Sequence, residues 1–382
     1  MEQIQAAEIS EERPARRTRT NALSSHQLIA MTFIIGFGLN MLNLPAVLVM
    51  DGGSDGWLAM LFITAVDCIA LYFTLLVMRR FREVNVSGKA YKIIRAVLAV
   101  VFLIWSLGKL MLIIGEARMF FGKTVFANLD WLVFLGLLGA LAAILGAGGG
   151  RALGRLCELF LPIAAVTVIM LVVMSYSGGT HFSDVLPILH NNADVLKCPI
   201  KYALWTGNYP VLCVFFRNVE FKKHTCAVST AAAGISGLMA AALTFALSAA
   251  YGNIRHLIYY GSNAADMNQY VSNYNFGRID LIVFTVWSVV LLMESGIFQH
   301  AAVECVSAII PKSYPHIYSV AVGVVVYVLM NLLVPCDVRL FTFATKYMPY
   351  YSLAVQTALP AVGAAAVAVH MIACRKRKRR QN

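Results

Sequence analysis

Long apolar stretches alternate with short polar ones along almost the whole chain. A transmembrane helix needs about 20 consecutive, mainly apolar residues to cross the hydrocarbon core of a bilayer. Ten spans of this kind are predicted, with approximate limits 26–50, 57–78, 93–120, 130–147, 153–176, 199–217, 226–250, 281–308, 316–334 and 346–373. The pattern therefore predicts an all-α integral membrane protein with ten transmembrane helices.

The first and sixth spans are each interrupted near their middle by residues that disfavour a helix. The interruptions are residues 36–40 (GFGLN), which Pro45 follows, and residues 206–210 (TGNYP). A helix that unwinds inside a membrane frees backbone N–H and C=O groups, which lipid cannot pair but a bound solute or ion can. Interrupted spans at corresponding places in two halves of a membrane protein are the best sequence indication of a transporter-type binding site.

Ten spans divide into two sets of five, and each set then begins with an interrupted span. Repeat one covers about residues 26–176 and repeat two about residues 199–373, within a membrane domain 23–374. Residues 1–22 form a polar tail and residues 375–382 a basic tail, both expected in the cytoplasm. Sequence similarity between the halves is too weak to show the repeat, so the division depends on the matched interruptions.

Composition supports a membrane protein and argues against a nucleic-acid partner. Hydrophobic residues make up 59% of the chain and charged residues 13%, whereas soluble domains are about 45–50% apolar and about 25% charged. The net charge of +12 comes from short basic clusters between apolar spans rather than from a basic face with interleaved aromatic residues. We therefore expect the lipid membrane, and no nucleic acid, as a partner.

The distribution of basic residues predicts the orientation. If both tails are cytoplasmic, 22 of the 31 lysines and arginines fall in the tails and inner loops, as the positive-inside rule requires. The first 22 residues have no apolar core or small-residue cleavage site, so we expect a solvated tail rather than a secretory signal. Both termini are therefore predicted to be cytoplasmic.

Three charged residues, Asp67, Lys109 and Glu294, lie inside apolar spans. Such charges are costly and are usually buried, paired and functional, and at about 1.5 Å per residue all three fall near the middle of the bilayer. We expect Lys109 to pair with Asp67 or Glu294 beside the interrupted helices. Glu116, seven residues after Lys109, shares its helix face. Two alternatives remain open. One of the carboxylates couples protons, acts as a switch or binds a ligand ammonium, or the charges form a purely structural ion pair.

The interruptions themselves provide the candidate ligand-binding residues. Free N–H groups at a helix start favour a carboxylate, and free carbonyls favour a cation or ammonium, so a zwitterionic amino acid suits both. The candidates are Gly36, Phe37, Gly38, Asn40, Trp205, Thr206, Gly207 and Asn208. The alternative for the first two glycines is tight packing of helices through small residues.

Other motifs indicate no enzyme, metal or cofactor. The eight cysteines have no CxxC or metal-ligand spacing, and the eight histidines form no HExxH. The glycine-rich run 146–150 continues with Arg-Ala rather than Lys-Ser/Thr, so it is not a phosphate-binding loop. No nucleophile has a base at a recognisable spacing. We therefore expect neither catalytic residues nor a cofactor.

Several motifs resemble one known family, the spore germination permeases, which are the B subunits of nutrient germinant receptors. Residues 36–38 (GFG), 44–45 (LP) and 53–57 (GSDGW) resemble the beginning of the family pattern. Residues 151–160 (RALGRLCELF) are similar to the segment with which the fifth span of the family starts. Residues 277–280 (GRID) resemble its start of the eighth span, although Asp280 replaces the usual Glu. Residues 115–118 (GEAR) lack the threonine-proline pattern of the family.

The resemblance implies membership of the amino acid–polyamine–organocation superfamily and a LeuT-like 5+5 inverted repeat, with broken helices one and six. It also implies a place in the inner membrane of a bacterial spore, beside a larger A subunit and a lipoprotein C subunit. Such a subunit senses a small nutrient, such as an amino acid, to trigger germination. A secondary amino-acid transporter is the alternative, because it shares the fold and the pocket.

Overall fold

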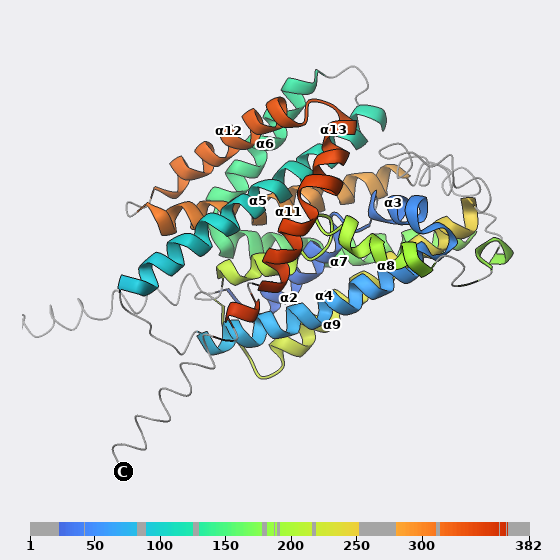
Figure 1. Cartoon of the computed structure of the whole chain (residues 1–382), viewed down its shortest axis with the longest axis horizontal. Coiled ribbons are helices and arrows are strands. Elements are labelled where there is room, and N and C mark those ends of the chain that lie inside the picture. The colour runs from blue at the N-terminus through green and yellow to red at the C-terminus, as the bar shows by residue number, and fades with distance from the viewer. Residues whose placement is uncertain are drawn as a thin grey trace, which may run out of the picture.

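The computed structural model describes residues 23–41, 43–81, 89–124, 130–177, 182–186, 188, 192–215, 219–251, 280–310, 314–358, 360–363 and 365. These residues are almost entirely helical (Figure 1), which confirms the all-α fold. Both predicted tails lie outside the described residues. The elements are α2 (Ser25–Phe37), α3 (Asn43–Gly52), η1 (Gly53–Asp55), α4 (Gly56–Phe81), α5 (Lys89–Thr124), α6 (Trp131–Ala147), α7 (Gly149–Ser177), η2 (Phe182–Val185), α8 (Asn192–Lys201), η3 (Tyr209–Phe215), α9 (Thr225–Tyr251), α11 (Asp280–Ile309), α12 (Pro315–Leu333), α13 (Asp337–Thr342) and the single π-turn η5 (Phe343–Tyr347). Residues 349–358 and 360–363 are also helical.

Six helical stretches of the described chain are long and apolar enough to cross a membrane: Asn43–Arg80, Ile93–Gly122, Gly149–Val173, Thr225–Ala249, Ile282–Ile309 and Pro315–Leu333. Two shorter apolar helices, α2 and α6, accompany them. Each predicted span contains described helical residues, although residues 202–208 of the sixth are irregular and residues 366–373 of the tenth lie outside the described chain. The total of ten crossings stays a prediction.

Two boundaries differ from the predicted limits. The helix of the sixth span begins at Asn192 rather than near residue 199, and that of the tenth begins at Asp337 rather than near residue 346. Both extensions begin with polar or charged residues. An apolar window ends where such residues start, although a helix can continue into the polar interface region.

The interruption of the first span is real. Helix α2 begins with a capping box, in which Ser24 and Gln27 bond each other's backbone N–H. The helix ends at Phe37, the chain turns through residues 38–41, and α3 starts at Asn43. Pro45 lies in the first turn of α3, where proline is tolerated because N–H groups there have no partner within the helix. Pro45 therefore helps to start the second half-helix, α3.

The sixth span is interrupted more widely. Helix α8 ends at Lys201, residues 202–208 are irregular, and a 3₁₀ helix runs from Tyr209. Gly207 has φ +63°, a left-handed conformation that glycine adopts without steric cost. A side chain there would also overlap Gln356. Both the local conformation and the packing therefore require glycine at this position.

The helices form two packed groups (Figure 1). In one group α4 packs along α9, and α2 and α3 pack against α9; in the other, α11 packs against α5, α6 and α12. The paired elements α4 with α9 and α5 with α11 hold corresponding places in the two predicted repeats. Between α3 and α4 the chain reverses at Gly53, with φ +63°. The interrupted spans contact both groups, because α2 packs against α9 and α11, and η3 packs against α4 and α11.

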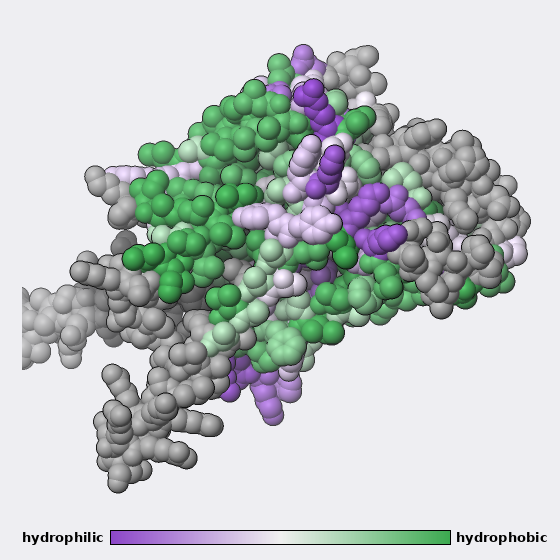
Figure 2. All heavy atoms as spheres, viewed as in Figure 1, coloured by the Kyte–Doolittle hydropathy of each residue, from purple (hydrophilic) through white to green (hydrophobic). Residues whose placement is uncertain are grey.

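The surface is mostly apolar. Figure 2 shows hydrophobic residues over most of the described face, with hydrophilic residues gathered near α13, α3 and α8. Large apolar side chains are widely exposed, among them Ile144, Leu159 and Leu332, each 68% exposed. Exposed apolar patches of this extent mark a surface that contacts another apolar phase, which for long apolar helices is lipid.

Candidate functional site

The eight predicted ligand-binding residues are all buried, at or beside the two interruptions. Gly36 and Phe37 still belong to the last turn of α2, whereas Gly38 and Asn40 lie in the turn that follows it. The other four residues lie in the irregular segment 205–208. The structure therefore places these residues at the two interruptions, as predicted, and side chains from four other helical segments converge on them.

Lys109 is the centre of the site. Its side chain reaches from α5 and is fully buried. The Nζ atom donates to the carbonyl oxygens of Leu204 (2.6 Å) and Thr206 (2.7 Å), and to Oδ1 of Asn208. A lysine ammonium has three N–H donors, so every donor has an acceptor in the unwound segment of the sixth span.

The two intramembrane carboxylates bind N–H groups of both interruptions. Glu294 of α11 accepts from the backbone N–H of Leu39 through Oε2 (3.0 Å) and from Nδ2 of Asn208 through Oε1 (3.3 Å). Asp67 of α4 accepts from the backbone N–H of Gly207 through Oδ2 (3.1 Å). These contacts tie the unwound backbone of both interruptions to α4 and α11.

The predicted direct ion pair between Lys109 and Asp67 or Glu294 is replaced by an indirect connection. Asn208 accepts from Lys109 with its oxygen and donates to Glu294 with its nitrogen. The three oxygens around Lys109 use all its donors, so none is left for a carboxylate. Both carboxylates still attract the ammonium electrostatically. The predicted charge network is therefore present, but it is organised around the unwound backbone.

Free carbonyl groups of the interruptions also have side-chain partners, which the sequence reasoning missed. Trp287 donates its indole N–H to the carbonyl of Gly38 (2.9 Å). Nε2 of Gln356 donates to the carbonyls of Ala203 (2.7 Å) and Thr206 (2.8 Å). The sequence offered one signal for such a partner, a polar side chain within an apolar span. Many residues besides Gln356 have this feature, so it did not single Gln356 out. The expectation that this backbone is left free for a solute is therefore wrong for the bonded groups.

Glu116 confirms the shared helix face. It lies two turns after Lys109 on α5, and its Oε1 accepts from the indole N–H of Trp205 (2.9 Å). Both charged side chains therefore contact the segment 204–208 from the same helix, one at Trp205 and one at the carbonyls around it.

Two groups within the site have no partner among the residues that the structure describes. Oδ1 of Asn40 is buried without a hydrogen bond, and the hydroxyl of Thr206 makes none with any described residue. An unpaired buried acceptor costs about 1–3 kcal/mol. These two polar side chains are therefore the groups that remain available to a ligand.

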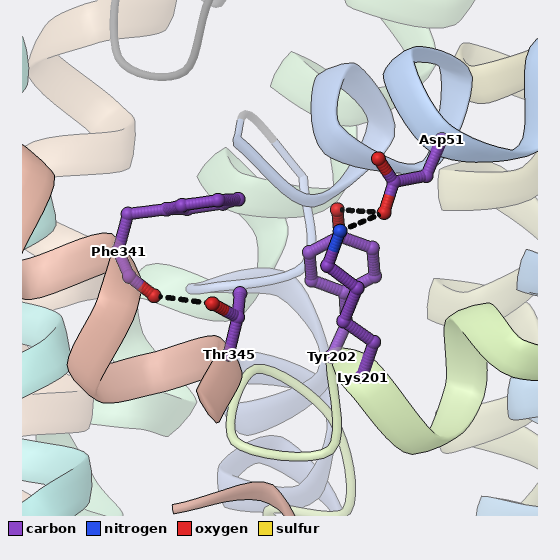
Figure 3. Close-up of polar contacts among 5 residues, drawn as sticks. All are labelled: Asp51, Lys201, Tyr202, Phe341 and Thr345. Atoms are coloured by element: carbon purple, nitrogen blue, oxygen red, sulfur yellow. Dashed lines mark hydrogen bonds and ion pairs between the residues drawn. The ribbon is translucent and has the colours of Figure 1, made fainter. Parts of the chain in front are cut away.

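A polar cluster joins α3 to the end of α8, as Figure 3 shows. Asp51 of α3 forms an ion pair with Lys201 at the end of α8 and accepts from the hydroxyl of Tyr202 (2.7 Å). Nζ of Lys201 also lies 5.9 Å from the centre of the Phe341 ring of α13, within the range of a cation–π contact. The cluster therefore connects α3, α8 and α13, which belong to the predicted spans one, six and ten.

The described residues contain no group of three or more His, Cys, Asp or Glu side chains that could hold a metal ion.

Comparison with known proteins identifies both a family and a fold. The family model described as "Spore germination protein" matches residues 22–335. None of the curated proteins compared matches the chain.

Solved transporters share the fold. MhsT in complex with L-phenylalanine has a TM-score of 0.61 at 12% identity, over 90% of this chain and 97% of that one. The nucleobase-cation-symport-1 family transporter Mhp1, closed around bromovinylhydantoin, has a TM-score of 0.52 at 12% identity, over 90% and 77%. A variant of the Eremococcus coleocola manganese transporter has a TM-score of 0.50 at 10% identity, over 87% and 75%. The chain therefore shares the LeuT-like fold of these solved transporters.

Proposed function

The chain belongs to the spore germination protein family, and from that premise we propose that it is the nutrient-sensing membrane subunit of a spore germinant receptor. It is an integral, multi-pass membrane protein with a LeuT-like fold. In this proposal a small solute binds between the two unwound segments and thereby triggers germination. The A and C receptor subunits are its proposed partners, and the inner membrane of the spore, with both termini in the cytoplasm, is its proposed location.

The unpaired side-chain oxygen of Asn40 is the observation that supports the solute site most directly. The oxygen is buried in the turn 38–41, where the first span unwinds. A ligand N–H or ammonium would supply the missing donor. The hydroxyl of Thr206, on the other unwound segment, can donate to a ligand carboxylate. An amino acid carries both complementary groups.

The remaining predicted residues have supporting roles in this proposal. Phe37 and Trp205, both buried, would provide the apolar part of the solute site. Gly36 and Gly38 allow close packing, because an added Cβ would overlap Ser236 at the first and Glu294 at the second. Gly207 and Asn208 hold the unwound backbone through Asp67, Lys109 and Glu294.

A thermal-shift screen of the purified full chain across amino acids, sugars and nucleosides tests the proposal. A ligand at 100 times its dissociation constant stabilises a protein by about 2.7 kcal/mol, so the matching nutrient should raise the melting temperature. Asn40→Leu should lose this response. Asn331→Leu is the matched control, because Asn331 bonds only the carbonyl of Tyr327 within its own helix α12. An unchanged response of Asn40→Leu would contradict the assignment of the site.

A second experiment separates sensing from transport. Membrane vesicles that contain the chain alone are supplied with the labelled nutrient identified in the screen. The proposal predicts binding without accumulation. Accumulation above that of empty vesicles would favour the alternative function, a secondary amino-acid transporter. Co-purification with the A and C subunits tests the proposed assembly.

A further inference from the structure

The three oxygens around Lys109 form a cation site built from the unwound backbone. Two are main-chain carbonyls, of Leu204 and Thr206, and the third is the amide oxygen of Asn208. Carbonyl and amide oxygens are the ligands that alkali and alkaline-earth cations prefer in proteins. In transporters with broken helices, unwound carbonyls of this kind coordinate the coupling Na⁺ or H⁺. Here the oxygens instead contact an ammonium that is covalently part of the chain.

We propose that Lys109 is a tethered cation that permanently fills this site, so that the solute site forms without dissolved Na⁺ or K⁺. The inference deepens the proposed function, since it takes the unwound segments as the solute site. It separates this chain from an ion-coupled transporter, in which the cation must enter and leave in each cycle. A cation fixed to α5 can do neither.

The surroundings of Lys109 support a permanent cation. The charges of Asp67 and Glu294 attract the ammonium, and Nζ lies 5.4 Å from the centre of the Trp105 ring on the preceding turn of α5. The indole N–H of Trp105 in turn donates to the hydroxyl of Ser352 (3.1 Å). The ammonium is thus held by three oxygens, two nearby carboxylates and an aromatic face, so its removal would take a donor from the carbonyl of Leu204 and the amide oxygen of Asn208 inside the membrane.

The test measures cation dependence without any nutrient, so its outcome is independent of the nutrient screen. The melting temperature of the detergent-solubilised wild-type protein is compared in NaCl, KCl and choline chloride at equal ionic strength. The inference predicts the same melting temperature in all three salts and no saturable binding of radioactive sodium. A melting temperature that rises saturably with Na⁺ or K⁺, relative to choline, would overturn it.

Chemical rescue provides the variant arm. Lys109→Ala removes the side chain beyond Cβ, which propylammonium replaces atom for atom. The variant should melt at a lower temperature, and propylammonium should restore part of the loss in a concentration-dependent way. Lys109→Met is the matched control, because it also removes the charge but fills the space, so propylammonium should have no effect. Equal responses of the two variants to propylammonium would contradict the inference. If Lys109→Ala does not fold, the salt comparison on the wild type decides.

Discussion

Gly38 offers the sharpest test of the contact between the first unwound segment and α11. It follows the last residue of α2, and a Cβ added to it would overlap the carboxylate of Glu294. Its backbone φ of −52° and ψ of −79° lie near the helical region, so alanine is not excluded by local conformation. Gly38→Ala therefore acts through the displaced carboxylate rather than through backbone strain.

The expected cost has two parts. Displacing Glu294 breaks its bond to the N–H of Leu39, and a hydrogen bond to a charged group contributes about 1.5–3 kcal/mol. Forcing extra volume into a packed interior adds about 1–3 kcal/mol. The sum, about 2.5–6 kcal/mol, is a large part of a typical folding free energy of about 5–15 kcal/mol. We therefore expect Gly38→Ala to melt at a clearly lower temperature than the wild type.

Thermal unfolding of the purified protein in detergent is the assay, and Gly122→Ala is the matched control. Gly122 lies near the end of α5, where an added Cβ would meet nothing within 4 Å. Alanine in an exposed helix gains about 0.5–1 kcal/mol over glycine, so the control should melt at the same temperature or slightly higher. If the melting temperature of Gly38→Ala were lower than that of the wild type by less than about 2 °C, the loss of stability would be less than roughly 1 kcal/mol for a large domain. That result would refute the reasoning.

Three further substitutions test separate contacts by the same unfolding assay. Asn208→Leu leaves Lys109 and Glu294 each one partner short and should cost about 2–4 kcal/mol; a loss below about 1 kcal/mol would contradict the bridging role. Trp287→Phe leaves the Gly38 carbonyl unpaired and should cost about 1–3 kcal/mol. Trp57→Phe is its control and should be neutral or stabilising, because that indole N–H is buried without a partner. Arg118→Gln removes an ion pair with Asp337 between side chains 22% and 32% exposed, so we expect a loss of about 1 kcal/mol or less; a loss of several kcal/mol would show that the pair is more strongly coupled.

The helices and their interruptions could be predicted from the sequence because local features determine them. Apolar windows identify each span, and Gly207 and Pro210 mark where the helix of the sixth span cannot continue. Intramembrane charges such as Lys109 were identifiable because each is isolated in an apolar window. The helix starts at Asn192 and Asp337 were not predicted, because each helix begins several residues before the apolar window does.

The partners of each polar group could not be predicted, because they depend on how distant helices pack. Lys109 and Leu204 are 95 residues apart, and Leu39 and Glu294 are 255 apart. The rule that membrane charges are paired correctly grouped Lys109 with two carboxylates, but it did not indicate that backbone oxygens would take every donor. An inward-facing polar residue such as Gln356 differs from a lipid-facing one only in the orientation of its helix.

The pairing of the unwound backbone changes how a solute can be recognised. A ligand carboxylate that bound the N–H groups of Leu39 or Gly207 would first have to displace Glu294 or Asp67, leaving a carboxylate unpaired in the membrane interior. Recognition through the side chains of Asn40 and Thr206 needs no such displacement. Substitutions at Asn40 should therefore change which nutrient stabilises the protein while the melting temperature without ligand stays close to that of the wild type. Substitutions at Glu294 should instead lower the melting temperature whether or not a nutrient is present, because this carboxylate holds both interruptions together. If Asn40 and Glu294 variants proved equally destabilised without ligand, recognition and scaffold would not be separable in this way.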